Sequence, residues 1–151
     1  KLMPGGYIKI GLYSKLARQK VSAARELIQT LGIQSTPEGI RDFRKQIFND
    51  DQHELKSISV LVNDFYSLSE CRDLCFHVQE HQFTTESLQK LLEDENLVFC
   101  GFMLPESIKA AYWQQFPEDI NGTSLSNWGE FEQDNQSSFQ SMYQFWAYKP
   151  L

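Results

Sequence analysis

Near its start the chain alternates between apolar and polar residues, with Ile8, Ile10 and Leu12 at every second position. This period of two is typical of a β-strand whose apolar side chains point to one face. A continuous apolar segment, residues 97–104, follows a helical pattern and predicts a buried strand. The aromatic segment at residues 143–148 predicts a third strand, which closes the fold.

Between the first two strands the apolar residues recur every three or four positions, which indicates helices. Ser67, with Glu70 three residues later, has the pattern of a capping box, and Thr84 is placed to cap the next helix. The expected helices span residues 17–31, 37–48, 54–62, 68–78, 85–92, 107–115 and 128–138. The order of elements predicts an α/β protein with one early strand, a long helical stretch and two late strands.

The composition is that of a folded protein, because 41% of the 151 residues are hydrophobic, enough for a domain with its own core. The formal net charge of −6 argues against a general nucleic-acid binder, which usually presents a basic surface. No apolar run reaches the roughly 18 residues that cross a membrane, so we expect no membrane partner. Three cysteines, an odd number, favour a reducing compartment, and we therefore expect a cytoplasmic protein.

Several segments, in the same order along the chain, are similar to one enzyme family. Residues 2–6, Leu-Met-Pro-Gly-Gly before an apolar strand, resemble the turn and fifth strand of class I S-adenosylmethionine-dependent methyltransferases. Residues 11–18 and 65–84 resemble blocks of a bacterial branch of that family that is often fused to tetratricopeptide repeats. Residues 83–102 are similar to the family's last helix and sixth strand, and residues 143–149 to its seventh strand.

The resemblance implies the C-terminal part of a Rossmann-like methyltransferase fold. Its sheet would be mixed and three-stranded, with the closing strand antiparallel between the first and the middle strand and buried on both faces. The chain would form a single partial domain, 1–151. Residues 1–14 would be the turn and fifth strand, residues 15–82 a helical insertion on the substrate side, and residues 83–151 the last helix with the sixth and seventh strands.

The resemblance also implies S-adenosylmethionine as cofactor and a methyl acceptor that the sequence does not identify. A site for this cofactor needs a glycine-rich loop after a strand and an acidic residue that holds the ribose. No stretch of these residues combines the two, since Gly5 and Gly6 precede a strand. We therefore expect the 151-residue chain to bind the cofactor weakly and to be inactive in methyl transfer alone.

Candidate site residues come from the predicted insertion and from the strand before it. Methyl transfer is a direct displacement, in which the protein aligns the acceptor and can remove a proton from it. His77 and Glu80 are the candidates for this catalytic role. The candidates for substrate binding are Tyr13, Tyr66, Arg72, Asp73 and His81. Asp73, His77 and His81 are four apart, so on one helix they would share a surface, and a solvated face explains that spacing as well.

Two zinc hypotheses compete with this interpretation. Residues 77–81 match His-x-x-Glu-His, in which two histidines on one helix bind zinc and the glutamate acts as base in a hydrolase. The third ligand would have to come from later acidic residues such as Glu106 or Glu132. Cys71 and Cys75, with the two histidines, could instead form a structural zinc site, although their spacing also fits packing in a helical core.

A further alternative is a non-catalytic helical module that binds another protein. The amphipathic segment 14–31 could meet a partner, and Trp113, Trp128 and Trp146 could be anchors. Tryptophans buried around the closing strand would favour the partial methyltransferase fold, whereas two or more on one open surface would favour a partner site. A partial fold would also leave apolar surface exposed, so we expect a possible homodimer.

Overall fold

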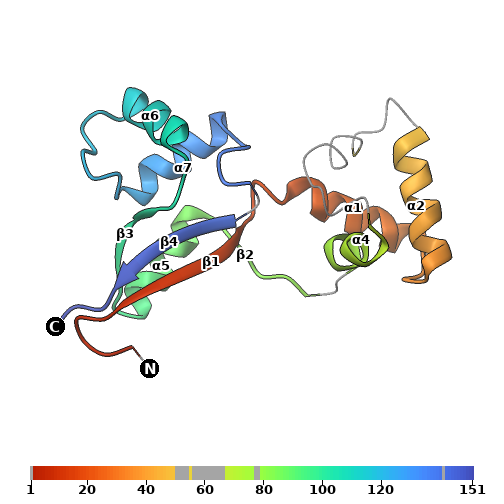
Figure 1. Cartoon of the computed structure of the whole chain (residues 1–151), viewed down its shortest axis with the longest axis horizontal. Coiled ribbons are helices and arrows are strands. Elements are labelled where there is room, and N and C mark those ends of the chain that lie inside the picture. The colour runs from red at the N-terminus through yellow and green to blue at the C-terminus, as the bar shows by residue number, and fades with distance from the viewer. Residues whose placement is uncertain (1, 50–54, 56–66, 77–78, 141) are drawn as a thin grey trace. The chain divides into compact units, whose positions relative to one another are not determined.

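A computed structural model gives the structure of the chain. It describes residues 2–49, 55, 67–76, 79–140 and 142–151. The chain forms two compact units, which we call the sheet unit and the helical unit (Figure 1). The sheet unit joins Lys1–Arg18 to His81–Leu151, and the helical unit is the intervening Gln19–Glu80. The sequence predicts an insertion at residues 15–82, and the compact helical unit is slightly shorter at both ends.

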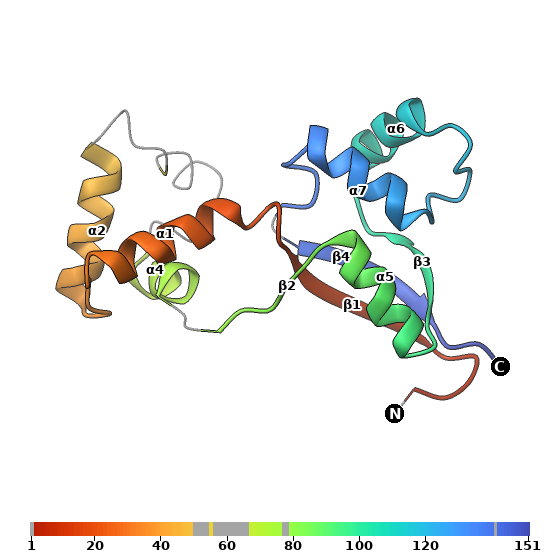
Figure 2. The same ribbon diagram turned by 180° about the vertical axis from the view of Figure 1, so that it is seen from behind.

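One mixed sheet of four strands lies in the sheet unit. The strands are β1 (Tyr7–Ser14), β2 (Gln82–Phe83), β3 (Val98–Phe102) and β4 (Met142–Tyr148). Their order is β2-β1-β4-β3, and β4 runs antiparallel to both of its neighbours (Figure 1 and Figure 2). The predicted order of the first, last and middle strands is confirmed.

The prediction of a three-stranded sheet is wrong, because β2 adds a fourth strand. It pairs in parallel with the end of β1, where Tyr13 lies opposite Gln82 and Ser14 lies opposite Phe83. A strand of two residues is too short to show an alternating pattern in the sequence. Its pairing depends on β1, which is distant in the sequence, so local reasoning does not find it.

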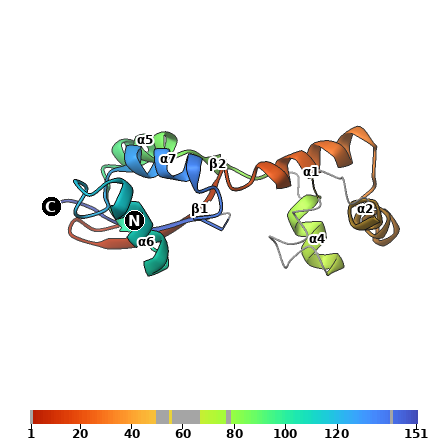
Figure 3. The same ribbon diagram turned by 90° about the horizontal axis from the view of Figure 1, so that it is seen from above.

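Helices cover one face of this sheet. β4 buries Tyr143, Phe145 and Ala147, and the two residues between them are exposed. α5 (Thr85–Asp94) and α7 (Leu125–Asp134) pack on the buried face, and Figure 3 shows both on the same side of the sheet. The expectation that the closing strand is buried on both faces is therefore wrong. Its aromatic residues are divided between a covered face and an open one.

The core of the sheet unit consists largely of aromatic rings around Phe102. Five rings have centroids 4.7 to 6.0 Å from that of Phe102, and they belong to Phe99, Trp128, Phe139, Tyr143 and Phe145. α6 (Glu106–Gln115) joins this core through Tyr112, whose ring stacks on Trp128 at 3.6 Å and 11°. These contacts fix α6 and α7 against each other and against the sheet.

The helical unit has a separate core built mainly from aliphatic residues. Its described helices are α1 (Gln19–Thr30), α2 (Pro37–Asn49) and α4 (Leu68–Cys75). The buried members of this core are Val21, Ala24, Ile28, Ile40, Phe43, Ile47, Leu55, Cys71, Leu74 and Cys75. Both helical cysteines therefore pack in the apolar stripe, as predicted. The predicted helix at 54–62 lies outside the described residues, except for the buried Leu55.

Two helix starts follow their predicted caps closely, while several other helix boundaries differ from prediction. The side chains of Ser67 and Thr84 accept hydrogen bonds from the third residue of α4 and α5, as expected. α7 begins three residues before the predicted Trp128, because Ser124 accepts a hydrogen bond from the Asn127 N–H. α4 ends at Cys75 rather than at residue 78. Among the described residues, no helix has the length and apolar character needed to cross a membrane.

Candidate functional site

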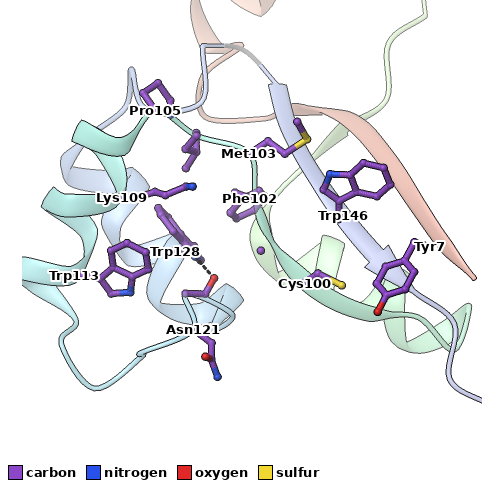
Figure 4. A pocket seen from close by; sticks show the side chains of 13 residues that line it. Tyr7, Cys100, Phe102, Met103, Pro105, Lys109, Trp113, Asn121, Trp128 and Trp146 are labelled. Atoms are coloured by element: carbon purple, nitrogen blue, oxygen red, sulfur yellow. Dashed lines mark hydrogen bonds between the residues drawn. The ribbon is translucent and has the colours of Figure 1, made fainter. Parts of the chain in front are cut away.

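An open groove of about 750 Å³ lies on the sheet unit, beside β3. The open sheet face supplies one wall with Tyr7 and Trp146, and α6 supplies the opposite wall with Lys109 and Trp113. Figure 4 shows the two tryptophans on opposite sides of β3. Trp113 and Trp146 are 37% and 42% exposed, whereas Trp128 at the back of the groove is 2% exposed. Two of the three predicted anchors therefore lie on one open surface.

The α6 wall is held in place by the loop that follows the helix. The indole N–H of Trp113 donates to the Asp119 carbonyl oxygen at 3.0 Å. Gly122, at φ +62°, lies so close that a Cβ there would be 3.6 Å from the Trp113 ring. The carbonyl of Gly122 accepts a hydrogen bond of 2.9 Å from the Trp128 indole. The Trp113 ring is thus oriented before any ligand arrives.

The Asp119 carboxylate organises this loop. It accepts hydrogen bonds from the Tyr112 hydroxyl at 2.5 Å, from the Thr123 N–H at 3.1 Å and from the Ser124 N–H at 2.9 Å. Burial alone would raise the pKa of Asp119, but these hydrogen bonds outweigh it and lower the pKa. The pKa of Tyr112 is raised, first by burial and then by its bond to Asp119. Both groups therefore keep the protonation states that their hydrogen bond requires at neutral pH.

Gly101 forms the floor of the groove at a β-bulge. The pairing of β3 with β4 shifts register between Phe99 and Gly101, and Gly101 has φ +119°. Outside its chain neighbours, the closest atom to a Cβ on Gly101 would be the Gly122 carbonyl oxygen, 4.0 Å away. A glycine is required by this backbone conformation, and its missing side chain leaves the groove open down to the backbone.

Cys100 and Lys109 add polar groups to the groove. Burial raises the pKa of the Cys100 thiol, so it stays protonated at neutral pH and is a poor nucleophile. The Lys109 ammonium lies 2.9 Å from the Glu106 carboxylate, one turn earlier on the exposed surface of α6. The chemistry of the groove is therefore that of stacking and charge recognition.

A second polar cluster lies buried at the carboxyl end of β1. Glu132 accepts hydrogen bonds of 2.5 Å from the Ser14 hydroxyl and from the Tyr143 hydroxyl, one on each carboxylate oxygen. Ser14 also accepts the Ala17 N–H at 3.1 Å, so it links the strand end to the following turn. Burial raises the pKa of Glu132, and the two hydroxyl donors oppose that shift. The cluster is shielded from solvent and fixes where β1 ends.

Two predicted site residues, Tyr13 and His81, lie near this end of the sheet unit. Tyr13 is half-buried, and the Arg18 guanidinium carbon is 4.4 Å from its ring centroid. His81 is exposed and directly precedes Gln82, which lies opposite Tyr13 in the β1–β2 pairing. The β1–β2 pairing therefore brings Tyr13 and His81 near each other, although 68 positions separate them in the sequence.

The other predicted residues belong to the helical unit. Glu80 forms an ion pair of 2.9 Å with Arg25. Arg25 also donates to the Leu74 carbonyl, so this one side chain ties α1 to α4 and to the segment that follows α4. Arg72 donates to the Ser35 carbonyl at 3.3 Å, and Asp73 is exposed. These three residues do not form one cluster in the described contacts.

His77 and Tyr66 lie outside the described residues. Because α4 ends at Cys75, Glu80 and His81 are not on a helix, and the expectation of one helix surface through residue 81 is wrong. The zinc hydrolase motif needs that helix to bring its ligands together. Within the described ranges, no group of three or more His, Cys, Asp or Glu side chains could hold a metal ion.

The glycines of the described chain do not fit the cofactor loop of a methyltransferase. Those with positive φ are Gly5, Gly32, Gly101 and Gly122. They lie before β1, after α1, in the β3 bulge and in the loop after α6, and none joins the carboxyl end of a parallel strand to a helix. Comparison with protein-family models gives no match to this chain, and comparison with curated proteins gives none.

Proposed function

We propose that this chain is the substrate-side portion of an S-adenosylmethionine-dependent methyltransferase of the bacterial, tetratricopeptide-associated branch, acting in the cytoplasm. The observation that carries the proposal is the strand order, in which β4 lies antiparallel between β1 and β3. The turn before β1 supports it further. Gly5 donates to the Lys149 carbonyl at 2.7 Å, and Lys149 donates back to Gly6 at 2.9 Å, so the glycine turn is fastened to the end of β4.

In this proposal the acceptor approaches the carboxyl end of β1. Ligands of open α/β sheets bind beyond the carboxyl ends of parallel strands. Tyr13 lies near that end of β1, and His81 lies close to it because it directly precedes Gln82, the partner of Tyr13. His77 or Glu80 would take a proton from the acceptor. Glu80 is paired with Arg25, so it could act as a base only after that ion pair opens. No step is assigned to the cofactor, because the described residues do not fit its loop.

The test is a calorimetric titration with S-adenosylhomocysteine. We would compare a chain extended upstream of Lys1 with the 151-residue chain under the same conditions. Binding by the extended chain alone supports the proposal. A well-folded extended chain that fails to bind contradicts it, whereas equal binding by both chains contradicts the expected weak affinity of the 151 residues. Light scattering of the same samples tests the expected homodimer.

A second candidate function is a binding role for the groove. It is favoured by the exposure of Trp113 and Trp146 on one surface, with a third tryptophan buried behind them. Partly exposed tryptophans in a preformed hollow are common anchors of binding sites. This role is compatible with methyl transfer, because the groove and the end of β1 involve different residues of the sheet unit.

A further inference from the structure

We propose that the groove beside β3 binds a small ligand that carries a flat ring and an anionic group. The inference goes beyond methyl transfer and does not depend on it. It rests on the second candidate function, the binding role of the groove, and names the chemistry of the ligand. The three observations behind it are the two exposed indoles, the glycine floor and the charge of the lining.

The two indoles provide the surfaces for a ring. Trp113 projects from α6 and Trp146 from β4, and Figure 4 shows them facing the groove from opposite sides of β3. Trp113 is already oriented by its hydrogen bond to Asp119 and by contact with Gly122. A preoriented ring loses little side-chain entropy on binding, so stacking contributes more of its energy to affinity.

The floor at Gly101 allows a flat ligand to approach the backbone. Among the described residues outside its chain neighbours, only the Gly122 carbonyl oxygen, at 4.0 Å, comes that close to where a Cβ on Gly101 would lie, so the backbone is open here. The volume of about 750 Å³ falls in the range of roughly 300–1,000 Å³ that is typical of small-molecule sites. A molecule of one or two rings fits this hollow.

The residues that line the groove carry a positive charge, which indicates that the ligand is anionic. Lys109 is the charged residue among the described groove residues, and no Asp or Glu joins it there. Lys9 lies opposite Trp146 in the β1–β4 pairing and is exposed on the same open face. These cations stand out on a chain with a formal net charge of −6. An anionic group is complementary to this side of the unit.

The ion pair of Lys109 with Glu106 does not block such a ligand. The Glu106 side chain is 85% exposed and the pair is local, three residues apart on α6. Exposed pairs of this kind contribute little to stability, so the ammonium can exchange its partner for a bound anion at little cost.

The experiment compares three probes with the same ring and different charge. Indole-3-acetate is anionic, indole-3-acetamide is neutral and tryptamine is cationic. Each is titrated into the ¹⁵N-labelled 151-residue chain at millimolar concentrations, and amide shifts are followed by NMR. We expect saturable shifts at residues 100–105 and around Lys109 and Trp146. We expect affinity to fall from the acetate to the amide to the amine.

Variants separate the contributions of the rings and of the charge. Trp113→Ala and Trp146→Thr should each weaken indole-3-acetate binding about two- to tenfold, the range expected for one aromatic contact. Lys109→Gln should weaken the acetate about two- to fivefold and leave the neutral amide unchanged. Lys90→Gln, at an exposed position on α5 away from the groove lining, is the matched control and should change neither. Circular dichroism establishes that each variant folds.

Three results would overturn the proposal. They are the absence of saturable shifts in the groove, a saturable site that maps to another surface, and tryptamine binding as tightly as the acetate. Should a tryptophan variant misfold, protection of the Cys100 thiol from a maleimide by indole-3-acetate replaces it as the readout. Absence of protection then counts against the proposal. These results are independent of the S-adenosylhomocysteine titration, so either proposal can fail while the other stands.

Discussion

The two units of this chain are built on cores of different character. Eight of the twelve buried residues in the sheet-unit core are aromatic, against one of the ten described in the helical-unit core. Among the described residues, those classed as buried and polar, such as Ser14 and Glu132, belong to the sheet unit, while the helical unit holds the largely buried Arg25–Glu80 ion pair. Ring pairs and buried hydrogen bonds depend on orientation, whereas aliphatic contacts depend mainly on volume. The comparison indicates that the sheet unit is the part with a fixed geometry, as a binding groove requires.

The largest expected effect comes from removing the ring at the centre of the sheet unit. Phe102→Ala should lower the free energy of unfolding by about 3–5 kcal/mol, since a buried ring is replaced by a cavity. Hydrogen exchange with mass spectrometry should show faster exchange in β3, β4 and α7 and little change in α1 and α2. Equal loss of protection in both units would mean that the two cores unfold together.

A matched pair of milder substitutions tests whether orientation matters more in one core. Phe102→Leu should cost about 2–3 kcal/mol, because it removes five ring contacts at once. Phe43→Leu, in the helical core, should cost about 1 kcal/mol, since the volume is nearly kept. Urea denaturation of the two variants measures both. Similar costs would remove the distinction between the cores.

The free energy of unfolding should depend on pH in part through the protonation of Glu132. Burial raises its pKa above the usual 4.5, so the folded state holds this proton more tightly than the unfolded state. The Glu132 carboxyl therefore contributes its full stabilisation below pH 4.5, and this contribution is lost as the pH rises through the pKa of the folded state. As the pH rises from 4.5 towards neutrality, Glu132→Gln should therefore gain stability relative to the wild type.

Thermal unfolding at several pH values measures this difference. Glu130→Gln, at an exposed neighbouring position on α7, is the control and should keep the wild-type pH dependence. If Glu132→Gln and the wild type follow parallel curves, the carboxyl does not titrate abnormally in the fold.

The smallest expected effect is a difference in the reactivity of the three cysteine thiols, measured without any substitution. Cys100 is exposed in the sheet unit, while Cys71 and Cys75 are buried in the helical unit. In native conditions a disulfide reagent should modify one thiol, and more slowly than a free cysteine, because the pKa of Cys100 is raised. All three should react in denaturant. Early modification of a second or third thiol would show that the helical core opens readily.

Much of the fold could be predicted because its causes are local. Ser67 and Thr84 start their helices through side-chain caps, and the alternation of Ile8, Ile10 and Leu12 defines β1. The short strand β2 could not be predicted, since its two residues are ordered by β1. The open face of β4 was missed for a related reason, because the aromatic pattern does not reveal which face the helices cover.

The candidate groove was only partly visible in the sequence. The sequence suggests Trp113 and Trp146 as possible anchors, but their spacing gives no sign that they flank one hollow. Gly101 is an isolated glycine inside an apolar strand, which is a signal of a bulge, but where the bulge falls depends on the register of β3 against β4. Likewise Ser14 and Glu132 are 118 positions apart, and only the packing of α7 on the sheet brings them together.

The bulge in β3 also bears on how the protein behaves when it is concentrated. In the described sheet β3 is an edge strand, and a regular edge offers a row of N–H and C=O groups to which further chains can add. The irregular register between Phe99 and Gly101 interrupts that row, and the Gly122 carbonyl lies close beside it. The glycine thus makes this aromatic edge a poorer template for added strands, and we expect a variant that straightened it to aggregate more readily.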